Sequence, residues 1–166
     1  MKRRLGEILI AAALLAGCGA TPQPTSSEPV DLRCHELIDH INAPPETYNV
    51  VADVVAFNPA QLSVSSPPGD PDGRLWAKDG LVIRAGAQFE ILAPTSTGED
   101  LTFGWGSIDG VSALRVPACE FRGSDWMVFA GGWTPRERGC YDVFVRVGGV
   151  IESVQMAIGA PCDPQT

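Results

Sequence analysis

Short apolar segments separated by turn residues recur through this 166-residue chain, and this pattern limits its fold more than any other feature. Clusters of glycine, proline and aspartate separate the segments, and residues 65–73 (SSPPGDPDG) have turn chemistry throughout. Strands of that length and spacing, without crossover helices between them, predict an all-β, immunoglobulin-like antiparallel β-sandwich rather than a βαβ fold. Residues 35–41 predict at most one short helix near the N-terminus. The expected strands cover residues 48–57, 81–84, 89–92, 101–105, 113–116 and 127–130.

The last two apolar segments predict a hairpin whose register can be read from the residues. Gly148 and Gly149 stand between residues 141–147 and 150–158, as a two-residue turn requires. With that turn, one face of the hairpin is almost entirely apolar, whereas a shift by one residue would place Ser153 and Gln155 on that face. The expected cross-strand pairs are Val147 with Val150, Val143 with Val154, and Tyr141 with Met156.

The N-terminus has the anatomy of a secretory signal. A cationic head precedes a short apolar run, and the run ends in Leu15-Ala16-Gly17-Cys18. This ending resembles the lipobox of bacterial lipoproteins, in which the chain is cut before the cysteine and the thiol receives diacylglycerol. The resemblance implies a signal peptide at residues 1–17, a lipidated Cys18 opening a flexible tether at residues 18–30, and a single β-sandwich domain at residues 31–166. It also implies export and a lipid anchor at the outer face of the cytoplasmic membrane.

Charge excludes some classes of partner. Removal of residues 1–17 takes away three of twelve basic and one of twenty acidic side chains, which leaves a net charge of −10. That balance disfavours nucleic acid and electrostatic adhesion to anionic lipid, so the acyl chains must provide the membrane link. The expected partners are therefore the membrane, through lipid on Cys18, and an envelope ligand or protein of unspecified identity. No other cofactor is expected.

Four cysteines remain once Cys18 is assigned to lipid, and an even number in an exported chain predicts two disulfides. The absence of any CxxC pair disfavours a Cys₄ metal site. Three pairings are possible. In the hairpin register Cys140 faces Ala157, which puts Cys162 about 16 Å further along unless the chain doubles back. We therefore prefer Cys119–Cys140, around a second turn at residues 131–132, with Cys34–Cys162 joining the ends of the domain.

No catalytic or metal-binding motif is complete. The segment from His35 to His40 (HELIDH) resembles a zincin HExxH, but the second histidine is one position too far. Residues 106–110 (GSIDG) lack the glycine spacing of a nucleophile elbow, and residues 70–73 (DPDG) lack the other ligands of a calcium loop. Lys78, the one lysine of the mature chain, is expected in a solvated turn with Asp79. We assign no catalytic residue and no metal ligand.

The four tryptophans are the most suggestive binding feature. Core packing is the favoured role for tryptophan in a β-sandwich, but an exposed indole can stack on a sugar or anchor a partner. Trp105 and Trp133 have neighbouring glycines, which allow close approach of a ligand, so these two are the candidate binding surface.

Five segments together resemble a group of actinobacterial secreted or lipid-anchored proteins without an assigned activity. They are residues 75–90, 103–106, 116–119, 126–133 and 159–162, which include FAGGW and GAPC. The resemblance covers the chain from about Cys34 to Cys162, and it departs at Trp133, where tyrosine or phenylalanine is expected. It implies an envelope location and a β-rich disulfide domain, and it implies no catalytic residues.

These observations favour a non-enzymatic, lipid-anchored envelope protein whose β-sandwich binds a ligand or partner. Two alternatives stay open. One is a hydrolase of envelope glycans that uses dispersed carboxylates such as Asp53, Asp109 or Asp125, which requires two of them about 5–10 Å apart. The other is a protein–protein interaction module, which requires an exposed aromatic patch.

Overall fold

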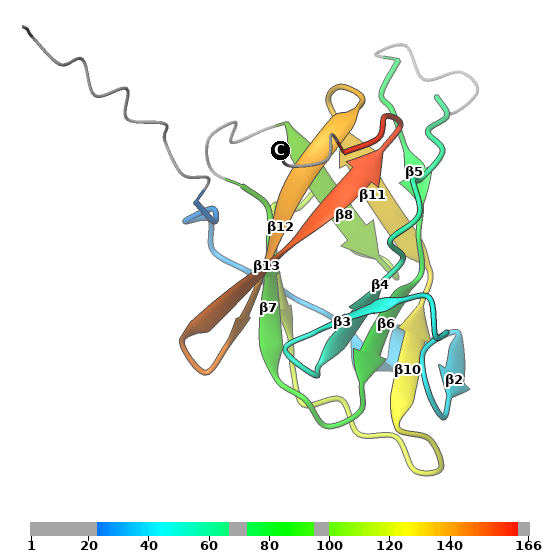
Figure 1. Ribbon diagram of the computed structural model, residues 1–166. Helices are drawn as coiled ribbons and strands as arrows, with labels where there is room; N and C mark the ends of the chain where they lie inside the picture. The colour runs from blue at the N-terminus through cyan, green and yellow to red at the C-terminus, as the bar shows by residue number, and fades with distance from the viewer. Residues whose placement is uncertain (1–22, 67–72, 95–99, 163–166) are drawn as a thin grey trace, which may run out of the picture.

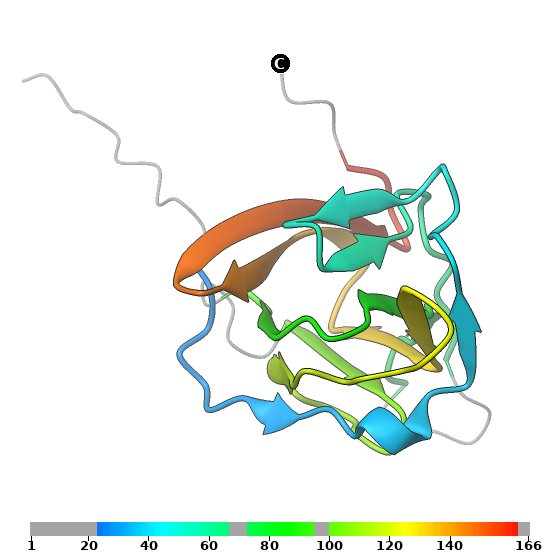
Figure 2. The same ribbon diagram turned by 90° about the horizontal axis from the view of Figure 1, so that it is seen from below.

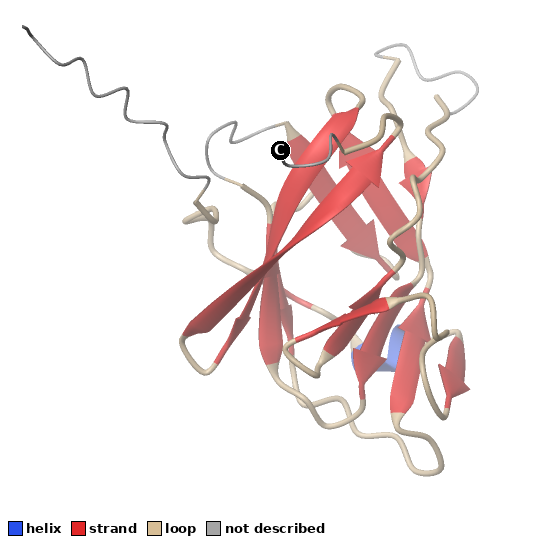
Figure 3. Cartoon of the chain, viewed as in Figure 1, coloured by secondary structure: helices blue, strands red, loops and turns tan. Residues whose placement is uncertain are grey.

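The computed structural model describes residues 23–66, 73–94 and 100–162 (Figure 1). These residues form an all-β antiparallel sandwich with two disulfides, as the sequence predicted (Figure 3). The expected signal peptide and the lipidation site Cys18 lie outside the described residues. Within them, no helix is long and apolar enough to cross a membrane. The strands are β1 (Val30–Asp31), β2 (Asp39–Ile41), β3 (Asn49–Val51), β4 (Val55–Phe57), β5 (Ala77–Lys78), β6 (Leu81–Arg84), β7 (Phe89–Leu92), β8 (Leu101–Trp105), β9 (Ala113–Val116), β10 (Trp126–Phe129), β11 (Gly131–Pro135), β12 (Gly139–Val147) and β13 (Val150–Ile158).

The described strands form three sheets. Two have five strands, in the orders β1-β9-β7-β12-β13 and β2-β10-β6-β4-β3, and a third has the order β5-β11-β8. Neighbouring strands run antiparallel except β1 and β9, which are parallel. Seen from below, β13 lies beside β3 (Figure 2), where the Ala52 amide donates a hydrogen bond of 3.1 Å to the Glu152 carboxylate. The two large sheets therefore meet along this edge and enclose the core.

The hairpin of β12 and β13 has the predicted register. Val147 pairs with Val150, Val143 with Val154 and Tyr141 with Met156. Gly148 and Gly149 form the turn with φ values of 54° and 91°, which side chains other than glycine rarely adopt. The pattern of apolar residues thus favoured this pairing, because a slip by one residue would have moved the apolar side chains to the other face of the hairpin.

Successive side chains of a strand point to opposite faces, and the two faces of the β1-β9-β7-β12-β13 sheet differ accordingly. Inward residues such as Ile91 and Val145 are fully buried in the main core. On the outward face, Arg146, Glu90, Arg115 and Asp31 lie opposite one another on adjoining strands. Glu90 forms ion pairs with Arg146 over 2.8 Å and with Arg115 over 3.4 Å, and Arg115 pairs with Asp31 over 3.1 Å. Charges of alternating sign therefore run across four strands. This ladder satisfies each charge locally and keeps the outer face polar.

Two elements differ from the sequence-based expectation. Residues 35–41 do not form one helix: a single 3-10 turn, η1 (Cys34–Glu36), is followed by β2. Residues 48–57 form two short strands joined by a turn, in which Ala52 and Asp53 have φ values of 48° and 58°. In both places strand pairing outweighs the local conformational preference of the residues. β2 pairs with β10, and the turn allows β3 to pair with β4.

The disulfide preference was wrong: the bonds are Cys34–Cys119 and Cys140–Cys162, with Cα separations of 5.4 Å and 4.9 Å. The chain does double back after β13. Gly159 has φ of 73° and lies beside Gly139 in a parallel bridge, which returns Cys162 to Cys140. Residues 131–132, taken as a turn, instead belong to β11, so nothing folds Cys119 onto Cys140.

The N-terminal segment is attached to the domain further back than Asp31. The Thr25 amide donates to the Ala93 carbonyl over 2.8 Å, Pro24 forms a bridge with Pro94, and Thr25 is only 8% exposed. The Ser112 hydroxyl lies 3.1 Å from that of Ser27. Residues 23–30 were expected to belong to the flexible tether, but they follow the edge of the first sheet into β1. Backbone pairing of this kind does not depend on side-chain hydrophobicity, which is why composition did not reveal it.

Candidate binding groove

Trp105 and Trp133 do not form a binding surface. They are 1% and 0% exposed, and their rings meet edge to face with centroids 5.1 Å apart. Phe103 joins them at 5.4 Å and 5.3 Å, and Phe57 lies 6.1 Å from Trp133. The neighbouring glycines admit protein backbone rather than a ligand, because a Cβ at Gly131 would clash with the Gly104 carbonyl and with the indole of Trp105. The general expectation that tryptophans fill the core holds for this pair.

Asp79 anchors both indoles from the connection between β5 and β6. Its backbone carbonyl accepts the Trp105 Nε1–H over 3.0 Å, and its carboxylate accepts the Trp133 Nε1–H over 2.9 Å. The residue is 6% exposed, so the expectation of a solvated turn is wrong for Asp79. Lys78 is exposed, as expected, but it belongs to strand β5 rather than to a turn. Burial raises the pKa of this carboxyl from 3.8 to about 6, although hydrogen bonds from Trp133 and from the Gly80 amide pull the pKa the other way.

The outer face of the β5-β11-β8 sheet carries a different set of residues. Lys78 pairs with Gly132 and Ala77 with Trp133, and Trp76 directly precedes this paired segment. Thr134 in turn pairs with Thr102 on β8. Trp76, Thr134 and Thr102 all line one groove, and they form a row on the side opposite the buried aromatic cluster. All three are partly exposed.

A groove of about 990 Å³ lies over this row. Trp76 is held at one side by two backbone hydrogen bonds with Ser65, of 2.8 Å and 2.9 Å. The loop after β8 forms the other side, where Ile108 and Asp109 fold over Gly104. A Cβ at Gly104 would collide with the Ile108 carbonyl, so the glycine is what lets the loop lie against the sheet. The remaining lining residues are Ser66, Arg74, Leu75, Gly106, Gly110 and Gly131.

The groove combines an aromatic ring with groups that donate and accept hydrogen bonds. Its lining has one indole, the hydroxyls of two threonines and two serines, one carboxylate at Asp109 and one guanidinium at Arg74. Its volume lies in the range of small-molecule and cofactor sites. The arrangement is suited to an uncharged ligand that has both an apolar face and many hydroxyl groups.

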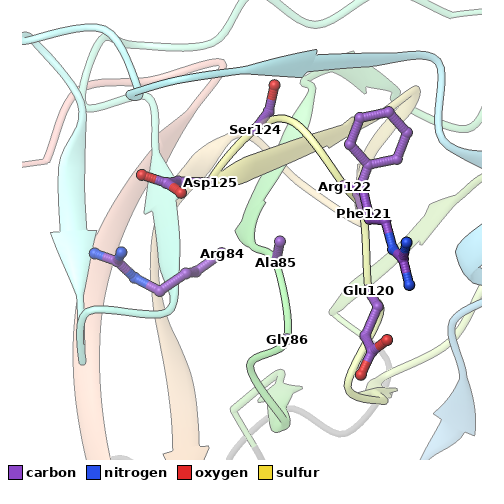
Figure 4. A pocket seen from close by; sticks show the side chains of 8 residues that line it. All are labelled: Arg84, Ala85, Gly86, Glu120, Phe121, Arg122, Ser124 and Asp125. Carbon is purple, nitrogen blue, oxygen red and sulfur yellow. The ribbon is translucent and has the colours of Figure 1, made fainter.

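The three carboxylates considered for glycan hydrolysis do not share a cavity. Asp109 lines the groove. Asp53 is exposed in the β3–β4 turn and forms an ion pair of 2.5 Å with Arg84. Asp125 lines a separate hollow of about 380 Å³, which Arg84 also lines (Figure 4).

That smaller hollow is organised by charge pairing. Arg84 stacks its guanidinium 4.8 Å from the ring centre of Trp126 while it binds Asp53. Figure 4 shows Asp125 and Glu120 on opposite sides of the hollow, with Ala85 and Gly86 between them. Of the three carboxylates considered for hydrolysis, only Asp125 lines this hollow in the described part of the chain.

Neither histidine belongs to a metal site in the described part of the chain. The His40 ring stacks on Phe121 with centroids 4.5 Å apart, and its Nδ1 lies 2.9 Å from the Ser124 hydroxyl. Glu36 accepts the Ser107 amide over 2.7 Å, and this bond lowers the pKa of its carboxyl. Among residues 23–66, 73–94 and 100–162, no three His, Cys, Asp or Glu side chains gather where they could hold an ion.

Sequence reasoning missed Trp76, the tryptophan that does line a surface groove. The signal was available in the alternation of β5, because Ala77 is apolar and Lys78 is charged, which places Trp76 on the outward side with the lysine. Comparison of the chain with protein-family models, with curated proteins and with solved structures found no match.

Proposed function

We propose that this chain is a lipid-anchored cell-envelope protein whose β-sandwich binds a neutral oligosaccharide in the groove over Trp76. The observation that carries the proposal is the row of Trp76, Thr134 and Thr102 on the floor of a 990 Å³ groove. The role is binding rather than catalysis, with Cys18 as the lipidated residue and the acyl chains as the membrane link.

The ligand class follows from the lining. A sugar ring presents an apolar C–H face, which stacks on an indole, and an edge of hydroxyls, which need donors and acceptors together. A nucleotide or other phosphate ligand would require several cations, whereas the groove balances Arg74 with Asp109. A lipid tail would leave the hydroxyls of Ser65 and Thr134 without partners, at a cost of about 1–3 kcal/mol each.

The location rests on the sequence and is consistent with the two disulfides. The lipobox-like ending at Cys18 supports export and acylation. Disulfides form and persist in oxidising compartments, which fits a domain outside the cytoplasm. The resemblance to actinobacterial lipid-anchored proteins supports the same location.

Binding can be tested with the purified mature protein and a panel of soluble oligosaccharides, read by calorimetry. We expect Trp76→Ala to abolish binding, because the stacking face is lost. Tyr48→Ala is the matched control, since Tyr48 is a partly buried aromatic that packs against the cluster of Val82 and Trp126 and does not line the groove. Thermal unfolding should show both variants folded. Binding that survives Trp76→Ala, or that Tyr48→Ala removes equally, would contradict the assignment of the groove.

The anchor has a separate test. Cells expressing the wild-type chain should incorporate a labelled fatty acid into the protein, and Cys18→Ala should remove both the label and the cleavage before residue 18. A labelled, membrane-bound Cys18→Ala protein would show that the lipid is attached elsewhere.

A further inference from the structure

The attachment of residues 23–30 to the first sheet has a consequence for how the domain sits on a membrane. We infer that the domain is held with one end against the bilayer, on a leash too short for free rotation. This inference rests on the proposed lipid anchor at Cys18. The partner of the surface concerned is the headgroup layer of the membrane.

The length of the leash is set by where the chain first contacts the domain. Pro24 bridges to Pro94, and the next residue donates its amide to Ala93 over 2.8 Å. Six residue steps separate Cys18 from Pro24. A fully extended chain covers at most about 3.6 Å per step, so the leash reaches about 20 Å. A domain of this size is about 35–40 Å across, by the usual scaling of radius of gyration with length. The far end of the domain is therefore out of reach of the bilayer.

The contacts define the end that faces the membrane. We call it the anchor-proximal surface: residues 23–27, Ala93, Pro94 and Ser112. It is fixed rather than fraying, because Thr25 is 8% exposed and the Ser27 and Ser112 hydroxyls lie 3.1 Å apart. It adjoins Leu92 and Ala113, which are 0% and 1% exposed although they lie on the outward face of the sheet.

The opposite end lies beyond the other ends of the same strands. β9 runs away from Ser112 to Val116, and the chain continues through Cys119 to the loop that contains Arg122. In Figure 1 this loop lies at the bottom of the molecule, whereas the described chain begins at the upper left. Arg122 is exposed and serves as the distal reference position.

One wall of the groove continues into the anchor-proximal surface. The loop that forms its wall, with Ile108 and Asp109, continues through Gly110 to Ser112, which contacts the N-terminal segment. Gly110 and Ser112 are two residues apart, at most about 7 Å. This wall, with Asp109, is consequently the side of the groove that lies nearest the headgroups.

The orientation can be measured on the lipidated protein in phosphatidylcholine vesicles that carry a quencher on the headgroup. A dye is placed, by incorporation of an unnatural amino acid, at Ser26, Asp109 or Arg122, all of which are exposed. We expect strong quenching at Ser26, slightly weaker quenching at Asp109 and several-fold weaker quenching at Arg122. A Gly/Ser insertion of about 15 residues before Gln23 should remove most of the difference, because it lengthens the leash beyond the width of the domain.

The outcomes separate the orientation from the anchor. Equal quenching at Ser26 and Arg122 in protein that floats with the vesicles would overturn the orientation while the anchor stands. Quenching at Asp109 as weak as at Arg122 would overturn the membrane-proximal position of this wall of the groove. Protein that carries no acyl label and does not float with the vesicles would overturn the proposed anchor itself, and the orientation with it.

Discussion

The buried carboxyl of Asp79 makes folding stability depend on pH in a defined direction. Its pKa is about 6 in the folded chain against 3.8 for an ordinary aspartate, because burial disfavours the charged form. A group whose pKa rises on folding stabilises the fold most when it is protonated. Its contribution is therefore complete below about pH 3.8 and is lost as the pH rises through 6. Asp79→Asn should remove this dependence while keeping an oxygen that accepts the Trp133 Nε1–H.

The size of the effect follows from the shift. The difference between 3.8 and about 6 is roughly two pKa units, and each unit corresponds to about 1.4 kcal/mol, so the ionised carboxylate costs about 3 kcal/mol. The residue is 6% exposed, so solvent screens little of this cost. At pH 7.5 we expect Asp79→Asn to be more stable than the wild type by up to about 3 kcal/mol, and at pH 3.5 we expect the two to differ little.

Urea unfolding with the disulfides intact, at several pH values from about 3.5 to 7.5, measures this difference. The contributions of other titrating groups cancel when the free energy of unfolding of the wild type is subtracted from that of Asp79→Asn. Asp125→Asn is the control, since it makes the same substitution at an exposed position. A difference between Asp79→Asn and wild type that stays constant with pH would refute the reasoning. A stability advantage of Asp79→Asn over the wild type that is smaller at pH 7.5 than at pH 3.5 would refute it too.

Two further predictions concern covalent and steric constraints. The disulfides close loops of different length, 85 residues for Cys34–Cys119 and 22 for Cys140–Cys162, so loop-closure entropy predicts losses of about 4.5 and 3.5 kcal/mol when each pair is replaced by alanine. Urea unfolding of the two double variants tests the order, and a larger loss for the shorter loop would contradict the entropic account. Gly104→Ala should destabilise the fold by about 1–3 kcal/mol, because its methyl group meets the backbone of the loop that walls the groove. Thermal unfolding checks this, and an unchanged midpoint would mean that the loop moves aside without cost.

The spacing of apolar and turn residues predicted much of the fold, because a strand with one buried face shows a recognisable apolar pattern in the sequence. The expected strands at residues 81–84, 89–92, 101–105 and 113–116 match β6, β7, β8 and β9 in the structure. The same reasoning failed at residues 35–41, where apolar spacing fitted a short helix but pairing with β10 made a strand. It failed again at residues 131–132, because two glycines read equally as a turn or as a strand that must approach its neighbour closely.

The candidate site was less accessible to sequence reasoning than the fold. Trp105 and Trp133 were chosen for their glycine neighbours, but glycine permits close approach by any atoms, and here those atoms are protein backbone. The role of Trp76 becomes visible only in the folded chain, where it lines the same groove as Thr134. Residues that are distant in sequence build the groove, so no local window contains it.

The sequence by itself determined the all-β class, the register of the β12–β13 hairpin and the presence of two disulfides, because alternation, turn chemistry and an even cysteine count act locally. Only the tertiary structure decided the cysteine pairing, the burial of Asp79 between two indoles and the attachment of Thr25 to Ala93. Each of these depends on which segments meet in space. Many chain paths satisfy the same local pattern, and packing of the whole core selects among them.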